Sequence, residues 1–441
     1  MIGICGAGMR VLARMCAERG YTVTGSDHDP SGEAADELGS LGIRVLPPSG
    51  DGAIVAADLA VYSIAIEKDH PELLAAVRLG IPVCSRADLL GALTADWPER
   101  ITVAGTHGKS TVTAMLASVL SSLGRDPTVA AGAPLSRVGG GYRAGGRELC
   151  VLEACEYRDS FLSLAPTVAV LTNAEWDHPD YFRDRAACLA SFRSYLSLPT
   201  VRLAILSGDD EGAKEVSEGL SVPYVTFGLS ESADVRATAI SEENGCCRFT
   251  LEAPGGTIGQ VSLAVPGRHN LKNALAAAAA ALAAGVDPSR LPGALGEFRG
   301  IPRRLEYRGS YRGVPYYDDY AHHPTEIRAA LAALRSEGGR LICIYQPHTY
   351  TRTESLFREL SEALSLADLP VLVDIYAARE ENRSGISSRA LAKAVGGLYF
   401  PTPEAASLFV RGVAREGDRV VVMGAGDVGT RVFRGVLTFA D

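Results

Sequence analysis

The stretch VAGTHGKSTVT, residues 103–113, has the residue types of a phosphate-binding loop. An apolar run leads into two glycines, and Lys109, Ser110 and Thr111 follow where a helical apolar pattern begins. In such a loop, backbone N–H groups and the N-terminus of the next helix face an anion, the lysine reaches the terminal phosphates and a hydroxyl binds Mg²⁺. The loop is shorter than the common G-x-x-x-x-G-K-[ST], because Val103 stands where the first glycine is needed. The alternative is a strand-to-helix turn that binds nothing.

Two segments supply carboxylates that a nucleotide-bound metal would need. In VLEACEYRDSFLSL, Glu153 follows two apolar residues typical of the end of a buried strand, and Glu156 lies one helical turn further on. In LTNAEWDHPDYF, a second apolar run leads to a polar cluster that includes His178. Ligands of open parallel sheets gather at the carboxyl ends of strands, so we expect Lys109, Glu153 and His178 to converge. Each segment taken alone is also typical of a solvated loop.

Two further motifs could reach a nucleotide. VPGRHNLKNALAAAAA predicts a strand that ends at Pro-Gly and a helix that opens at Asn270, with Asn273 three places on. These amides could cap the helix, or they could reach a base or phosphate. GIPRRLEY contains Arg304, and a guanidinium binds phosphate with two parallel hydrogen bonds. A solvated surface arginine is the alternative.

Two segments concentrate ionisable side chains after predicted strands. YYDDYAHHPTEI has acids and histidines at a predicted strand-to-helix turn, and YQPHTYTRT follows the predicted strand RLICIY. So many ionisable groups at strand ends are costly unless they contact a ligand. The side chains that could bind a substrate there are Asp319, His322, His323, His348 and Arg352.

The N-terminal stretch GICGAGM, followed by Asp27, is similar to the G-x-G-x-x-G fingerprint of dinucleotide sites. The fingerprint is incomplete, because Val11 stands at the place of the third glycine. Such a loop can hold a diphosphate without binding NAD, and the same applies to VVVMGAGDV near the C-terminus.

The chain of 441 residues is too long for one core, and its alternating strands and helices predict three α/β modules. Short strands such as IGIC begin the chain, residues 91–100 could be a linker, and residues 222–265 are rich in predicted strands. A net charge of −9, from 43 basic and 52 acidic residues, argues against a nucleic-acid surface. Nine cysteines without a C-x-x-C pair, no leader pattern and no long apolar run predict a cytoplasmic protein outside the membrane.

These motifs, in this order, resemble those of the Mur ligases, and the resemblance runs nearly end to end. GTHGKST is similar to that family's ATP loop, which serves ATP-dependent amide-bond formation on UDP-sugar precursors of peptidoglycan. GICGAGM, DDYAHHPTEI, QPHTYTRT and VDIYAARE together are most similar to the member that joins L-alanine to UDP-N-acetylmuramate. The resemblance implies a cytoplasmic acid–amino-acid ligase that uses ATP and Mg²⁺, acts as a monomer or homodimer and has no nucleic-acid or membrane partner.

The resemblance also implies three domains: a Rossmann-like UDP-sugar-binding domain at 1–92, a central P-loop ATP-binding domain at 93–300, and a Rossmann-like C-terminal domain at 301–441 that closes over ATP and the amino acid.

Site residues follow from the resemblance by position. The UDP-sugar contacts would be Gly3, Gly6, Gly8 and Ser63. The ATP contacts would be Gly105, Thr106, His107, Gly108, Lys109, Ser110, Thr111, Asn270, Asn273, Arg304 and Asp319. Ser110 and Glu153 would bind one Mg²⁺, and His178 a second. The residues facing the amino acid and the acyl group would be His322, His323, His348 and Arg352, with Arg352 as the partner of the amino-acid carboxylate.

The sequence departs from the family pattern at three places. Ala7 and Ile64 stand where serine is common, and Thr349 stands where many members have arginine. The change at Thr349 puts one amino-acid or acyl contact in doubt.

The spacing of lysines discriminates within the family. Later ligases of the pathway place a carbamylated lysine after the metal-binding histidine, whereas here no lysine occurs between Lys109 and Lys214, and Arg193 lies in that region. This absence favours the alanine-adding ligase. Two alternatives stay open: a recycling ligase that attaches a tripeptide to UDP-N-acetylmuramate, and a non-catalytic protein that binds a UDP-sugar or NAD.

Overall fold

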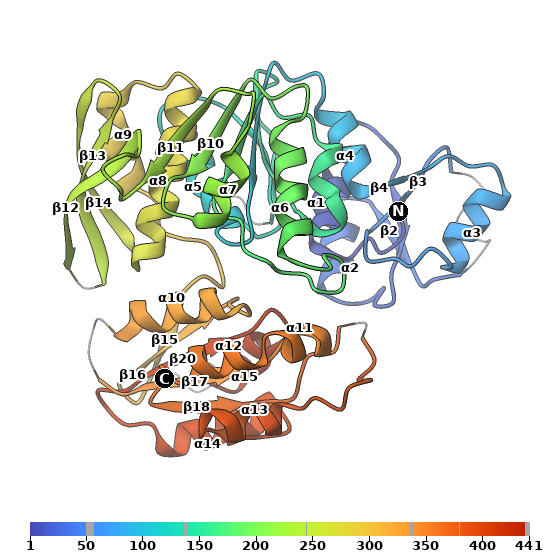
Figure 1. Ribbon diagram of the computed structural model, residues 1–441. Coiled ribbons are helices and arrows are strands. Elements are labelled where there is room, and N and C mark those ends of the chain that lie inside the picture. The colour runs from blue at the N-terminus through green and yellow to red at the C-terminus, as the bar shows by residue number, and fades with distance from the viewer. Residues whose placement is uncertain (50–56, 136–139, 244, 336–338, 379, 437–441) are drawn as a thin grey trace. The chain divides into compact units, whose positions relative to one another are not determined.

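The computed structural model of the chain divides into two compact units (Figure 1). The structure describes all residues except 50–56, 136–139, 244, 336–338, 379 and 437–441. The first unit consists of Met1–Glu175, Ala186–Val235 and Ala276–Leu291, and the second of Trp176–Arg185, Arg236–Leu275 and Pro292–Asp441. Both units contain parallel strands joined through helices, as the sequence predicts. The predicted boundaries after residues 92 and 300 are a different division and stay a prediction.

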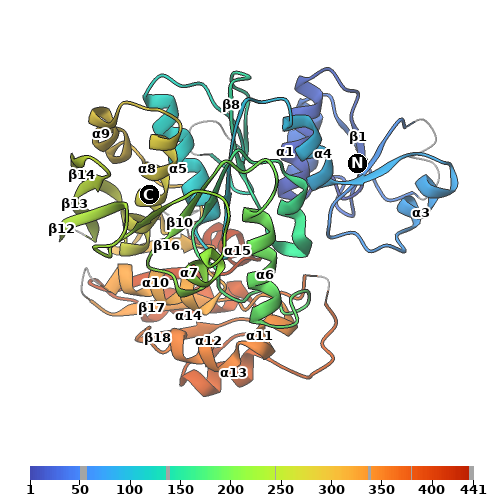
Figure 2. The same cartoon turned by 45° about the horizontal axis from the view of Figure 1, so that its top comes forward.

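The N-terminal part of the first unit contains short parallel strands with helices. Its elements are α1 (Ala7–Glu18), β1 (Thr24–Ser26), α2 (Glu33–Ser40), β2 (Arg44–Leu46), β3 (Ala60–Tyr62), α3 (Pro71–Arg78), β4 (Val83–Ser85) and α4 (Arg86–Thr94). Ile2 forms parallel bridges to both Ser26 and Tyr62, so it connects the β1–β2 pair with the β3–β4 pair. Helix α1 lies beside α4, and α3 lies across the short strands from them (Figure 2).

Two predictions for this part were wrong in detail. The predicted strand IGIC is reduced to bridges at Ile2, because Gly3 turns the chain with φ +75° and α1 begins soon afterwards. Residues 91–94 belong to α4 and not to a linker. A capping box between Ser85 and Asp88 starts that helix, and the buried Leu90 anchors it.

The central sheet of the first unit positions the phosphate loop. Its strands are β5 (Glu99–Ala104), β6 (Thr128–Ala130), β7 (Tyr142–Arg143), β8 (Leu149–Glu153), β9 (Val168–Leu171), β10 (Leu203–Ser207) and β11 (Tyr224–Gly228), in the order β11-β10-β9-β5-β8-β6-β7. All neighbours pair in parallel except β6 and β7. Its helices are α5 (Lys109–Ser122), the 3-10 helix η2 (Tyr157–Ser163), α6 (Arg185–Leu196) and α7 (Glu211–Ser217). The carboxyl ends of β8, β5 and β9 therefore lie at one edge.

The second unit contains an antiparallel meander (Figure 1). Its strands are β12 (Val235–Glu243), β13 (Cys246–Ala253) and β14 (Gly256–Pro266). The chain continues through α8 (Arg268–Ala283), which is divided between the two units, the 3-10 helix η3 (Pro288–Arg290) of the first unit, and α9 (Leu291–Gly296). The predicted strand-rich segment is confirmed. Helix α8 begins earlier than the predicted Asn270, because Gly267 at φ +95° ends the strand and the helix follows at once.

The C-terminal sheet has helices on both faces. Its strands are β15 (Glu306–Tyr311), β16 (Val314–Asp319), β17 (Leu341–Tyr345), β18 (Leu369–Leu372), β19 (Leu398–Tyr399) and β20 (Arg419–Met423), in the order β15-β16-β20-β17-β18-β19. Only β15 runs antiparallel to its neighbour. One core cluster includes residues of α10 (Pro324–Arg335), α12 (Phe357–Leu364) and α13 (Ser388–Val395), and another includes residues of α14 (Pro403–Val413) and α15 (Val428–Val436). The carboxyl ends of β16, β20 and β17 are neighbours, and α11 (Tyr350–Ser355) follows β17.

Within the described part of the chain, no helix combines the length and apolar character needed to cross a bilayer.

Candidate functional site

The turn between β5 and α5 has the backbone of a phosphate loop. Gly105 and Gly108 have φ +134° and +82°, values that favour glycine. A Cβ on Gly105 would lie 2.1 Å from the Thr172 hydroxyl oxygen, so a larger residue does not fit. Helix α5 starts at Lys109 and has Ser110 in its first turn. The unpaired N–H groups of that turn and the helix dipole favour an anion.

Polar groups that follow β9 hold the phosphate loop in shape. His107 N donates to Asn173 Oδ1 (2.9 Å), and Asn173 Nδ2 donates to His107 O (3.0 Å). Thr106 Oγ1 donates to Glu175 O (2.8 Å) and accepts from Glu175 N (2.9 Å). The segment predicted to approach the loop therefore does so through its amide and backbone groups.

The ammonium group of Lys109 is hydrogen-bonded to other groups of the protein. Its Nζ donates to Gly105 O (2.5 Å), Thr106 O (3.0 Å) and Glu156 Oε1 (3.1 Å), and lies 2.9 Å from Glu156 Oε2. Burial disfavours the ammonium, but the Glu156 charge outweighs it, so the pKa of Lys109 is raised. The sequence analysis named Glu156 among the carboxylates that could serve a metal but did not assign it to the site. The signal for it was the spacing of two glutamates, 153 and 156, just after a buried strand.

Glu153 is the last residue of β8 and pairs in register with Val103 of β5. Its Oε2 accepts from Gly132 N (2.7 Å), and its charge contributes to the raised pKa of Lys109. A carboxylate beside an anion-binding loop suits a divalent cation bound to phosphate, since hard cations prefer oxygen ligands. These residues of the first unit therefore fit a nucleotide with its Mg²⁺.

In the second unit, Arg352 forms a buried two-bond ion pair with Asp177. Nε donates to Oδ1 (3.0 Å), Nη2 donates to Oδ2 (3.2 Å), and the side chains are 7% and 5% exposed. Burial would raise the pKa of Asp177, but Arg352 and nearby histidines hold it well below its usual value. Arg352 Nη1 also donates to His348 Nδ1 (3.1 Å), and His178 N donates to Asp177 Oδ1 (2.7 Å). These bonds use three of the five guanidinium donors and leave two for a substrate carboxylate.

Three of the predicted histidines lie near the ends of β16 and β17. The rings of His322 and His348 are 5.8 Å apart between centroids. Burial lowers the pKa of His322 to about 3 and that of His348 to about 4, so both are neutral at physiological pH. His323 is 5% exposed, and its Nδ1 accepts from Thr325 N (3.4 Å). Neutral imidazoles can accept a hydrogen bond or a proton from a substrate.

The two predicted asparagines bond to each other and to the preceding strand. Asn270 Nδ2 donates to Pro266 O (2.7 Å), and Asn273 Nδ2 donates to Asn270 Oδ1 (3.1 Å). Their predicted contact with a nucleotide stays a prediction.

Arg304 and Asp319 lie close together in the second unit. Arg304 Nη1 donates to Glu326 Oε1 (3.2 Å). Asp319 accepts from Leu305 N (2.8 Å) and Ala321 N (2.7 Å). Burial raises the pKa of Asp319 to about 6, against the opposing effects of Arg304 and these N–H groups. The pair places a cation beside an acid at the start of the C-terminal sheet.

The predicted UDP-sugar residues cluster at the N-terminus. A Cβ on Gly3 would lie 3.3 Å from the Cβ of Ser63, and one on Gly8 would lie 3.1 Å from the Arg86 side chain. Gly6 precedes the first residue of α1. Small residues thus bring the loop close to both the end of β3 and the start of α4.

The acid of the dinucleotide-like fingerprint is turned towards its own loop. Asp27 Oδ2 accepts from Cys5 N (2.9 Å), and Oδ1 accepts from Asp29 N (3.5 Å). In NAD sites the corresponding acid accepts from the ribose 2′-hydroxyl. The bond to Cys5 therefore argues against an NAD site at this loop.

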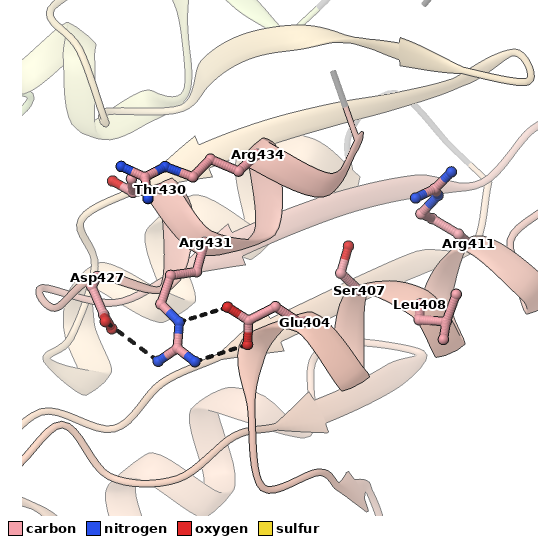
Figure 3. Close-up of a pocket in the computed structure, with 8 residues that line it drawn as sticks. All are labelled: Glu404, Ser407, Leu408, Arg411, Asp427, Thr430, Arg431 and Arg434. Carbon is pink, nitrogen blue, oxygen red and sulfur yellow. Dashed lines mark hydrogen bonds and ion pairs between the residues drawn. The ribbon is translucent and has the colours of Figure 1, made fainter. Parts of the chain in front are cut away.

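A hollow of about 690 Å³ lies between α14 and α15, and Figure 3 labels the residues that line it. None of them is a predicted site residue. Arg431 donates to both carboxylate oxygens of Glu404 (2.7 and 2.8 Å) and to Asp427 Oδ2 (3.4 Å). Because Arg431 pairs with Glu404 and Asp427 inside the protein, we take the strand ends, and not this hollow, as the candidate site.

Three family models match the chain in succession. They are the Mur ligase family catalytic domain at residues 1–98, the Mur ligase middle domain at 103–281, and the Mur ligase glutamate ligase domain at 303–426. They cover the phosphate loop, the strand-end acids and the histidine segments described above.

Curated relatives match over nearly the full length. The UDP-N-acetylmuramate–L-alanine ligase of Agathobacter rectalis is 40% identical, with 97% of this chain and 95% of the relative covered. The protein of the same name from Caldanaerobacter subterraneus subsp. tengcongensis is 39% identical, with 97% and 94% covered.

Two solved structures are similar over almost the whole chain. The UDP-N-acetylmuramate-alanine ligase of Thermotoga maritima has a TM-score of 0.83 and 27% identity, with 99% of this chain and 98% of that chain covered. A murein peptide ligase of Psychrobacter arcticus has a TM-score of 0.76 and 25% identity, with 99% and 97% covered.

Proposed function

This chain belongs to the Mur ligase family, and from that premise we propose that it joins L-alanine to the lactyl carboxylate of UDP-N-acetylmuramate, with hydrolysis of ATP to ADP and phosphate. The reaction belongs to peptidoglycan precursor synthesis in the cytoplasm. The observation that carries the assignment is the 40% identity over 97% of the chain to a ligase named for this reaction. The similarity to a solved alanine ligase supports it.

The carboxylate must first be activated, because an amine does not displace an oxide ion. A lactyl carboxylate oxygen attacks the γ-phosphorus of ATP, the bond to the bridging oxygen breaks, and ADP leaves. The product is an acyl phosphate. The neutral amine of L-alanine then attacks the carbonyl carbon, and the tetrahedral intermediate loses a proton and expels inorganic phosphate to form the amide.

The phosphate loop would bind the β- and γ-phosphates of ATP. Its backbone N–H groups and the start of α5 stabilise the charge that develops during phosphoryl transfer. Lys109 would exchange at least one of its bonds within the protein for a phosphate oxygen, because its three ammonium protons already have acceptors. Ser110 and Glu153 would hold one Mg²⁺ and His178 a second, and bound Mg²⁺ neutralises phosphate charge. Arg304, Asp319 and the two asparagines stay predicted ATP contacts.

The histidines and Arg352 would serve the amino-acid step. The two guanidinium donors of Arg352 that remain beside Asp177 and His348 match the two oxygens of an amino-acid carboxylate. His322 is neutral, so its ring can accept a hydrogen bond from the alanine ammonium group and orient the amine towards the acyl phosphate.

A phosphate-release assay with UDP-N-acetylmuramate and ATP tests the proposal. L-alanine, added as the single amino acid, should support phosphate release. Parallel assays with glycine and with L-serine measure how strictly the enzyme selects L-alanine. The similarity to a murein peptide ligase keeps the tripeptide-adding reaction as a second candidate. A requirement for a tripeptide would overturn the alanine assignment in favour of that reaction. NAD binding without phosphate release would favour the non-catalytic reading.

A further inference from the structure

Glu326 lies in the first turn of α10 and contacts two residues with different predicted roles. Its Oε1 accepts from Arg304 Nη1 (3.2 Å), a residue predicted to contact ATP. Its Oε2 accepts from His322 N (3.2 Å) and lies 3.4 Å from His322 Nδ1, a residue predicted to face the amino acid. The Glu326 carboxylate therefore connects a predicted ATP contact, Arg304, with a predicted amino-acid contact, His322.

Glu326 lies beside a cation and at the start of a helix. The side chain is 10% exposed, and the start of a helix stabilises a negative charge. Burial works against the Arg304 charge, but Glu326 and Asp319 outweigh it, so the pKa of Arg304 is raised. The Arg304–Glu326 bond uses one of five guanidinium donors and fixes the direction of the others. Pairing with Glu326 thus orients Arg304 without consuming it.

Glu326 also constrains the imidazole of His322. The bond from His322 N fixes the backbone that carries the ring. Ring Nδ1 lies 3.1 Å from Tyr320 O and 3.4 Å from Glu326 Oε2, and both oxygens are acceptors. These neighbours favour the tautomer with hydrogen on Nδ1. In that tautomer Nε2 has an electron pair that can accept a hydrogen bond from a substrate.

We propose that Glu326 is a positioning residue that sets the direction of the Arg304 guanidinium and the tautomer of His322 together. The carboxylate thereby orients both the predicted phosphate contact, Arg304, and the predicted amino-acid contact, His322. The inference rests on the proposed function, because the roles of Arg304 and His322 come from it.

Three variants test the proposal. Glu326→Gln keeps the size of the side chain and an acceptor for His322 N but removes the charge. Glu326→Asp keeps the charge on a shorter side chain. Glu359→Gln, at an exposed glutamate of α12, is the matched control. We expect kcat/KM to fall roughly ten- to a hundredfold in Glu326→Gln, the range of a charge-assisted hydrogen bond, with partial rescue in Glu326→Asp and no change in the control.

A double-variant cycle shows whether Glu326 acts through Arg304. The KM for ATP should rise in Arg304→Ala, and adding Glu326→Gln should raise it little further, because the group to be oriented is already gone. Independent, multiplied losses, or a Glu326→Gln enzyme with unchanged kcat/KM, would overturn the proposal.

The tautomer gives a readout that does not need catalysis. In ¹⁵N-histidine NMR spectra of the full chain, His322, assigned by the loss of its signals in His322→Gln, should show hydrogen on Nδ1. Glu326→Gln should shift these signals, and Glu359→Gln should not. Unchanged His322 signals in a folded Glu326→Gln protein would overturn the positioning role. A wild-type chain without ligase activity would overturn the proposed function, while the NMR result would still decide the role of Glu326.

Discussion

Because Lys109 pairs with Glu156, the substitution Lys109→Ala should change both the catalytic rate and the free energy of unfolding. Lys109 Nζ lies 2.9 Å from Glu156 Oε2, and the two side chains are 15% and 3% exposed. Lys109→Ala removes the cation proposed to meet the γ-phosphate, which should lower kcat by about 10²- to 10³-fold, the effect of losing one positioned charge in a transition state. It also breaks the buried ion pair with Glu156, which should lower the free energy of unfolding by about 3–5 kcal/mol.

A second substitution separates these two effects. The double variant Lys109→Ala/Glu156→Gln also removes the charge of Glu156. Its free energy of unfolding should therefore be closer to that of the wild type than that of Lys109→Ala is, while turnover stays low. Urea unfolding followed by circular dichroism measures the first quantity, and phosphate release with UDP-N-acetylmuramate, ATP and L-alanine measures the second. Near-normal turnover in Lys109→Ala would refute the role of Lys109 in phosphate binding. A double variant no more stable than Lys109→Ala would refute the reasoning about the buried pair.

Three further outcomes are expected. Gly105→Ala should lose ATP affinity at least about tenfold in calorimetric titration, because a Cβ there meets the neighbouring segment, whereas Gly124→Ala, with φ +85° and open space, should keep it. Asp177→Asn should lower the free energy of unfolding by about 3 kcal/mol and raise the KM for L-alanine, because Arg352 loses its buried partner; unchanged values of both would count against that pair. Burial lowers the pKa of His269 from 6.5 to about 4, so the unfolded state binds more protons in that window and stability falls as the pH drops through it. His269→Gln should flatten this fall in urea unfolding, and an unaltered pH profile would contradict the assignment.

The strand ends that carry the site could be predicted because buried parallel strands are short, continuous apolar runs. The runs ITVA, VLE and AVL form the carboxyl ends of β5, β8 and β9, and the predicted turn after β16 follows Asp319, the last residue of that strand. Strands of one parallel sheet end at one edge, so Lys109 and Glu153 could be expected near each other. Both lie in the first unit, and the charge of Glu153 acts on Lys109.

The partners of the charged side chains could not be predicted from sequence. Asp177 and Arg352 are 175 residues apart in the chain, and nothing local to either residue indicates that they pair. Similarly, the sequence offered both Glu153 and Glu156 as carboxylates, and the prediction assigned only Glu153 to the nucleotide site, although Glu156 is the one bound to Lys109. Apolar periodicity reports which face of an element is buried, whereas ion pairs depend on packing between elements.

Transfer of ¹⁸O tests the central claim most directly. UDP-N-acetylmuramate labelled with ¹⁸O in its lactyl carboxylate is incubated with the enzyme, ATP and L-alanine, and the phosphate and nucleotide products are analysed by mass spectrometry. The acyl-phosphate route predicts one labelled oxygen in the inorganic phosphate together with UDP-N-acetylmuramoyl-L-alanine. Unlabelled phosphate, or no amide product with L-alanine, would contradict the account.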